Sequence, residues 1–154
     1  MRIALTVNGE RVALDAEPRM HLIDLLRDRL DLTGSHIGCE HGVCGACTVR
    51  LDGVAVRGCL VLAVQADGCD VQTVEGMAQD AAFDDLRAAF VARNALQCGY
   101  CTPGMLTAAA ELLEAGGQPD RAAIRAHMSG NYCRCTGYQS IIDAVETVIR
   151  ARAP

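Results

Sequence analysis

The chain of 154 residues contains nine cysteines, and eight of them fall into two groups. Cys39, Cys44 and Cys47 lie in the segment Gly-Cys-Glu-His-Gly-Val-Cys-Gly-Ala-Cys, and Cys59 follows after eleven further residues. Thiolates are preferred ligands of zinc and of iron in iron–sulfur clusters. Three sulfurs on one short loop, with a fourth returning from a neighbouring segment, therefore predict a metal centre with four thiolate ligands.

The spacing of this first group favours a [2Fe–2S] cluster of the plant-ferredoxin type, which has the same C-x4-C-x2-C arrangement. Gly38, Gly42 and Gly45 would allow the unusual backbone conformations that a loop around a cluster needs. A zinc site with four cysteines is the main alternative, although such sites usually join two similar CxxC pairs. A Rieske centre would need a second histidine besides His41. Disulfides are unexpected because the thiols are odd in number and closely spaced.

The second group comprises the pairs Cys98-Gly-Tyr-Cys101 and Cys133-Arg-Cys135. Each pair lies between two predicted helices, and in an antiparallel arrangement both loops would be at the same end. We therefore expect these four thiolates to converge on a second [2Fe–2S] cluster, with a zinc site as the alternative. The charge of Arg134 would ease reduction of that cluster. Cys69 belongs to neither group and is expected to be a buried core thiol.

Composition excludes several classes of function. The net charge of −5, the pI near 5.3 and the scarcity of aromatic residues argue against a nucleic-acid partner, which would favour a basic, stacking surface. No apolar run is long enough for a membrane span, and no leader precedes the first predicted strand, so we expect a cytoplasmic protein. The length allows one large or two small domains, without room for flavin and substrate domains as well.

The N-terminal half alternates apolar and polar residues in short segments. Residues 2–7 and 10–14 flank Asn8-Gly9, and residues 48–51 and 54–57 flank Asp52-Gly53, so each set predicts a β-hairpin. Residues 20–30 carry leucines at helical spacing, and residues 71–74 predict a further strand. This pattern indicates an α+β fold whose first domain, residues 1–76, is a β-grasp ferredoxin-like [2Fe–2S] domain.

The C-terminal half is rich in alanine and predicts four helices with single apolar stripes. These are expected over 84–95, from Thr102-Pro103 to about 113, from Pro119 to 128, and from about 138 onwards. Val91 is expected on the apolar stripe of the first, and Thr102 at the N-cap of the second. We expect residues 77–154 to form a four-helix-bundle [2Fe–2S] domain that packs against the first domain.

The cysteine segments GCEHGVCGACTV with VRGCL, and ALQCGYCTPGM with SGNYCRCTGYQ, resemble those of the iron–sulfur small subunit of the molybdenum hydroxylases. This is the family of xanthine dehydrogenase, aldehyde oxidoreductase and aerobic carbon monoxide dehydrogenase. The resemblance covers nearly the whole chain and implies the same two domains. It also implies two partners, a large subunit with a molybdopterin-type cofactor and a medium subunit with FAD, in a heterotrimer or its dimer.

The resemblance also implies roles for individual residues. The cluster on Cys98, Cys101, Cys133 and Cys135 would lie beside the molybdopterin, and the cluster on the first group of cysteines would lie toward the flavin. Gln97 and Cys135 match positions that approach the pterin by hydrogen bonding, although Gln97 could instead stabilise its own loop. His36 stands where many members place lysine, and a plain loop histidine is the simpler interpretation.

The sequence thus predicts an electron-transfer subunit of a molybdopterin-dependent hydroxylase or dehydrogenase. It would relay single electrons from molybdenum in the large subunit through two [2Fe–2S] clusters to FAD in the medium subunit. The chain itself would contribute no acid, base or nucleophile, and the substrate would be chosen elsewhere in the assembly. The alternatives are a stand-alone ferredoxin-type carrier and a zinc-stabilised interaction module.

Overall fold

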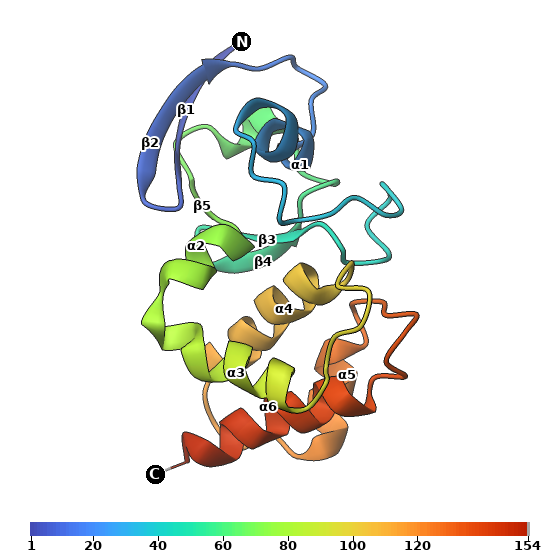
Figure 1. Ribbon diagram of the computed structural model, residues 1–154. Helices are drawn as coiled ribbons and strands as arrows, with labels where there is room; N and C mark the ends of the chain where they lie inside the picture. Colours follow the sequence, from blue (N-terminus) through green and yellow to red (C-terminus); the bar gives the residue numbers. More distant parts are fainter. Residues whose placement is uncertain (154) are drawn as a thin grey trace.

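The computed structural model describes residues 1–153 and consists of a sheet half followed by a helical half. Pro154, the last residue of the predicted C-terminal domain, lies outside the described residues. In Figure 1 the sheet half lies above the helical half, with the start of the chain at the top. The two halves pack together, as the sequence predicts, with helix α4 (Thr102–Glu114) against strands β3 (Thr48–Leu51) and β4 (Val54–Arg57). The chain therefore has a mixed α and β fold in which a ferredoxin-like part precedes a helical part.

The sheet has five strands in the order β2-β1-β5-β3-β4. β1 pairs antiparallel with β2, and β3 with β4, while β5 pairs parallel with β1 and antiparallel with β3. The short strand β5 therefore joins the two hairpins into one sheet. The strands are β1 (Arg2–Val7), β2 (Glu10–Asp15), β3 (Thr48–Leu51), β4 (Val54–Arg57) and β5 (Asp70–Gln72).

Both predicted hairpins are confirmed. The turn residues Asn8 and Gly9 have φ values of 51° and 84°, and Asp52 and Gly53 have values of 49° and 82°. A two-residue turn with positive φ at both positions matches the right-handed twist of the strands that it joins. These turns expose alternate strand residues and direct Ile3, Leu5 and Val7 into the core beneath the sheet.

The helix predicted over residues 20–30 is wrong in its regularity. A short α1 (Leu22–Asp24) passes into a π-helix, η1 (Leu25–Arg29), which ends with a hydrogen bond from Leu30 N to Leu25 O. The spacing of the leucines identifies the buried face of the helix. It does not distinguish an α-helix, in which each N–H bonds to the fourth preceding carbonyl, from a π-helix, in which it bonds to the fifth. The Arg27 guanidinium donates to the carbonyls of Thr33 and Ser35, which attaches this segment to the start of the cysteine loop.

The helical half surrounds its own apolar core, which includes Phe90, Met105, Ile124, Ile141 and Val145. Helix α2 (Val74–Gln79) was not predicted from the sequence, because six residues are too few to show a clear helical period. The two cysteine pairs of this half lie in the α3–α4 and α5–α6 connections, where the sequence places them. Besides α4, the helices are α2 (Val74–Gln79), α3 (Asp84–Ala92), α5 (Arg121–Met128) and α6 (Gln139–Ala151), with a 3₁₀ turn, η3, at Ala81–Phe83.

Two details of these helices correct the sequence prediction. Val91 is 69% exposed. The face of α3 that packs on the core carries Leu86, Ala89 and Phe90, and Val91 lies on a different face of the helix. Thr102 is the first residue of α4 instead of its N-cap, and its hydroxyl is buried with no partner among the described residues. The helix has Pro in its first turn, as predicted.

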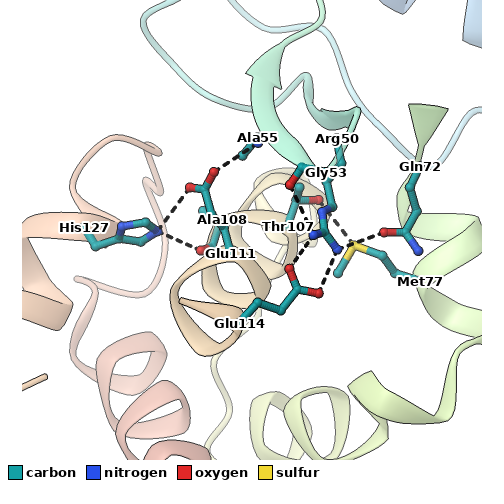
Figure 2. Close-up of polar contacts among 10 residues, drawn as sticks. All are labelled: Arg50, Gly53, Ala55, Gln72, Met77, Thr107, Ala108, Glu111, Glu114 and His127. Carbon is teal, nitrogen blue, oxygen red and sulfur yellow. Dashed lines mark hydrogen bonds and ion pairs between the residues drawn. The ribbon is translucent and has the colours of Figure 1, made fainter. Parts of the chain in front are cut away.

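Polar contacts join α4 to the sheet (Figure 2). The Arg50 guanidinium of β3 donates to Gln72 Oε1 at 3.1 Å, to the Gly53 carbonyl at 3.2 Å and to both carboxylate oxygens of Glu114. One turn earlier, Glu111 accepts from the backbone N–H of Ala55 at 3.0 Å. β4 is an edge strand, so this carboxylate satisfies a donor that would otherwise face solvent. Side chains of one helix therefore help to fix the two halves relative to each other.

No helix in residues 1–153 combines the length and the apolar character that crossing a bilayer requires.

Candidate iron–sulfur sites

The first group of cysteines lies on the loop before β3 and in the turn after β4. Cys47 and Cys59 are each 2% exposed, whereas Cys39 and Cys44 are partly exposed. The loop is the cyan segment that projects beside β3 in Figure 1. Because β3 and β4 are antiparallel, Thr48 lies opposite Arg57. The turn that carries Cys59 therefore returns next to the loop that carries the other three cysteines.

Within this group the thiols interact two by two. The backbone N–H of Cys44, followed by that of His41, lowers the pKa of Cys39 to about 6, and the Cys44 side chain acts in the same direction. Cys44 N lies 3.3 Å from Cys39 Sγ. Burial raises the pKa of Cys47 to about 11, and the Cys59 thiol adds to the rise. A metal centre would offset this penalty, since metal ligation deprotonates thiols.

Glycines shape this loop for two different reasons. Gly42 and Gly45 have φ values of 83° and 74°, which side-chain-bearing residues rarely adopt. At Gly38 the reason is space, because a Cβ there would lie 3.0 Å from Cys44 Sγ. The loop backbone therefore passes close to the cysteine sulfurs, and one of its N–H groups, that of Cys44, points at Cys39 Sγ.

The second group gathers at one end of the helices. Cys98 Sγ and Cys135 Sγ lie 3.5 Å apart, although 37 positions separate these residues in the sequence. Burial raises the pKa of Cys101 to about 12, and the Cys133 thiol contributes to the rise. Burial acts against the ionisation of Cys133 as well, but hydrogen bonds led by that from Thr136 lower its pKa. Thr136 Oγ1 lies 3.2 Å from Cys133 Sγ. The helical site thus also consists of two thiol pairs.

Pairing of this kind fits a binuclear cluster, in which each iron takes two protein thiolates. A single zinc ion would need four sulfurs arranged tetrahedrally about one point. The thiol donors of both groups and their arrangement in pairs match the ligand set of a [2Fe–2S] cluster.

The other cysteine and histidine singled out by the sequence have different surroundings. Cys69 is partly exposed instead of buried, with Gln65 O and Asp67 O both 3.9 Å from its sulfur, because it lies in the turn before the short β5. His36 is more than a plain loop residue. Its ring stacks on Tyr100 with centroids 4.5 Å apart, and its Nδ1 lies 2.8 Å from Tyr100 O.

Gln97 and Cys135 are both exposed, as is Cys98. The helical site therefore presents one edge to the surface, whereas Cys47 and Cys59 of the first site lie inside the protein. Arg134 is exposed between Cys133 and Cys135.

Contacts between backbone and side-chain groups join the two sites, and no periodicity in the sequence predicted them. Tyr132 N donates to Cys44 O at 2.8 Å, which links the residue before Cys133 to a cysteine of the first site. The Tyr100 hydroxyl donates to Ile37 O at 2.5 Å. Only the position of these residues next to cysteines could have drawn attention to them.

Comparisons with known proteins agree with this geometry. Residues 5–98 match the family described as "2Fe-2S iron-sulfur cluster binding domain", and residues 73–146 match that described as "[2Fe-2S] binding domain". The gamma subunit of caffeine dehydrogenase from Pseudomonas sp. (strain CBB1) is 50% identical over 149 residues, which are 95% of this chain and 89% of that subunit. The chain belongs to the iron–sulfur small subunits of the molybdenum hydroxylase family.

Two further relatives support this membership. The small subunit of nicotine 6-hydroxylase from Paenarthrobacter nicotinovorans is 50% identical over 145 residues, covering 94% of this chain and 87% of that subunit. The crystal structure of quinoline 2-oxidoreductase from Pseudomonas putida 86 superposes with a TM-score of 0.90 at 50% identity, covering 99% of this chain and 97% of that one. This small subunit is thus the iron–sulfur, electron-transferring component of an oxidoreductase complex.

Proposed function

We propose that this small subunit holds two [2Fe–2S] clusters and relays single electrons between a molybdopterin-type cofactor and FAD, each bound by a partner subunit. The observation that carries the proposal is the grouping of eight cysteines into two sites of paired thiols, joined by the hydrogen bond from Tyr132 N to Cys44 O. When bound, each cluster supplies a one-electron redox centre. The chain supplies ligands, backbone donors and partial exclusion of water.

The proposed ligands of the two clusters follow the two groups. Cys47 and Cys59 would form the buried side of the first cluster, and Cys39 and Cys44 its outer side. The second would be held by Cys98, Cys101, Cys133 and Cys135, in what we interpret as a four-helix bundle built from α3 to α6. Domain limits of 1–76 and 77–154 remain our proposal, and α2 spans that boundary.

The order of the relay is proposed from exposure. Gln97 and Cys135 lie at the exposed edge of the helical site, where an amide can both donate to and accept from a pterin. The partly exposed Cys39 and Cys44 would then face the FAD-binding subunit. The chain would thus span a large and a medium subunit in a heterotrimer or its dimer. We also propose a cytoplasmic location, where thiols remain reduced.

The substrate class of the assembly is suggested by its relatives. The three similar proteins described above are named for caffeine, nicotine and quinoline, all of which are N-heterocyclic compounds. We therefore propose that the complex oxidises an N-heterocycle, with the substrate pocket in the large subunit. Turnover of a panel of N-heterocycles and aldehydes by the purified complex tests this; a preference for aldehydes would contradict it.

Replacement of Cys101 by serine tests the ligand assignment. A hydroxyl is a poor substitute for a buried thiolate, so the variant should lose the helical cluster and keep the other. Iron analysis of this subunit should then give about half the iron of the parent. Electron paramagnetic resonance of the reduced complex should show one cluster signal in place of two. Cys69→Ser is the matched control and should retain both signals. Two unaltered signals in Cys101→Ser would refute the assignment.

A further inference from the structure

We infer that Asn131 and Gly104 are positioning residues that hold the two cluster sites at a fixed separation and thereby set the rate of electron passage between them. This inference rests on the proposed function. Neither residue is proposed to bind a cluster directly. Asn131 lies two positions before Cys133, and Gly104 lies three positions after Cys101, so both belong to the helical half. Their common contact, Gly45, lies in the loop of the first site, between Cys44 and Cys47.

Asn131 reaches across from the helical half as a buried side chain. It is 2% exposed, and its Nδ2 donates to Gly45 O at 3.0 Å and lies 3.2 Å from Thr48 Oγ1. Thr48 Oγ1 in turn donates to Gly45 O at 2.6 Å. The Gly45 carbonyl therefore accepts from both sides. An amide buried in this way is expensive unless it is hydrogen-bonded, which favours the observed arrangement over displaced ones.

Gly104 closes the other side of this contact. A Cβ at Gly104 would overlap Gly45 O and would lie 2.9 Å from Asn131 Nδ2. A Cβ at Gly45 would lie 2.6 Å from Asn131 Cγ. The helix that follows Cys101, the loop carrying Cys44 and the segment leading to Cys133 therefore meet without space for one additional carbon atom.

A second set of hydrogen bonds, from the side chain of Arg57, stabilises the same contact. The Arg57 guanidinium of β4 donates to Thr48 Oγ1 at 2.6 Å and to Gly130 O at 2.5 Å. Gly130 is next to Asn131, so the sheet and the segment before Cys133 are joined twice. This arrangement matters because the ligands of the two sites are carried by different halves of the chain. Ligation alone fixes the geometry within each cluster and leaves the separation between them to such contacts.

The rate of electron tunnelling between two centres falls exponentially with the distance between them. The magnetic dipolar coupling of two paramagnetic centres falls with the cube of that distance. Gly104→Ala would displace the Gly45 loop from α4 by about 1 Å to restore ordinary van der Waals contact. Alanine favours a helix over glycine, so the substitution should not weaken α4 itself. Both the coupling between the reduced clusters and the rate between them should therefore decrease.

The experiment compares Gly104→Ala with Gly76→Ala in the full chain loaded with its clusters. Gly76 is the matched control, because it also lies in a helix and a Cβ there would also overlap an asparagine side chain, that of Asn8, in a contact without cysteines. The readouts are iron content, low-temperature electron paramagnetic resonance of the fully reduced protein, and the rate of electron redistribution after rapid one-electron reduction. Asn131→Ser, which shortens the side chain without adding volume, is measured in parallel.

Gly104→Ala should retain both cluster signals, lose part of their mutual splitting and redistribute electrons several-fold more slowly, whereas Gly76→Ala should match the parent protein. Asn131→Ser should change the coupling in the same direction. Unchanged coupling and rate in the loaded Gly104→Ala or Asn131→Ser protein would overturn the inference. A parent protein that lacks two cluster signals would instead refute the proposed function, so the two failures are distinguishable.

Discussion

Replacement of Arg50 by methionine should weaken the attachment of the two halves to each other and so lower the free energy of unfolding. The Arg50 side chain is only 12% exposed, and its guanidinium binds Gln72, Gly53 and Glu114 (Figure 2). Methionine can fill much of the space of the aliphatic stem but cannot donate, so the three acceptors would each lose a charge-assisted partner. The change therefore removes the polar attachment of α4 to β3 while keeping most of the apolar contact.

The magnitude follows from these contacts. A hydrogen bond to a charged group contributes about 1.5–3 kcal/mol, but an exposed ion pair contributes only about 0–1 kcal/mol. Glu114 is 40% exposed and Arg50 Nε has no partner among the described residues, so the lower part of the range applies. We expect a loss of about 2 kcal/mol in the free energy of unfolding, or a decrease of roughly 4–8 °C in Tm for a domain of this size.

Thermal unfolding of the cluster-loaded chain measures this effect, followed both by far-ultraviolet circular dichroism and by visible absorbance. Arg2→Met is the matched control, since Arg2 and Asp15 form an ion pair whose side chains are 69% and 75% exposed. That variant should differ from the parent by less than about 0.5 kcal/mol. Equal Tm values for Arg50→Met and Arg2→Met would refute the reasoning that this contact holds the halves together.

Three further predictions concern single side chains. Tyr100→Phe removes the hydroxyl that binds Ile37 O and should shift the resonance signal of the helical cluster, since the loop beside Cys101 loses a contact; an unshifted signal would show that the bond is immaterial. Hydrogen bonding from Arg152 lowers the pKa of Asp85, so the stability contributed by this pair is present above the unfolded carboxyl pKa and is lost as the pH falls through the folded value. Arg152→Ala should accordingly lower the Tm at pH 7 by an amount that disappears in acid, and an equal decrease at both pH values would contradict this. Burial, followed by nearby Asp52, raises the pKa of Cys69, so its thiol should react slowly with alkylating agents at neutral pH; rapid labelling would contradict it.

Local sequence signals predicted much of the sheet and of the cysteine loops. Asn8-Gly9 and Asp52-Gly53 specify their turns because few other residue pairs adopt positive φ at both positions. The placement of β5 between β1 and β3 could not be read in the same way, because three residues carry no register and their partners are distant in sequence. The apolar stripe of α6 was correct, since Ile141, Ile142, Val145, Val148 and Ile149 are all buried.

One error has a local cause, and other residues were missed for a non-local one. Helix α5 begins at Arg121, two residues after the predicted start at Pro119, because the Asp120 carboxylate caps it by accepting from Ala123 N at 2.8 Å. The site residues that the sequence missed, Asn131 and Tyr100, act through contacts between segments far apart along the chain. Such contacts depend on how the halves pack, which neither spacing nor periodicity encodes.

The metal content of the purified chain tests the central claim most directly. Iron and acid-labile sulfide analysis, combined with resonance spectra of the reduced protein, should give roughly four irons and four sulfides per chain and two distinct signals, as two [2Fe–2S] clusters require. Stoichiometric zinc, or a single cluster signal from the fully loaded parent protein, would contradict the account.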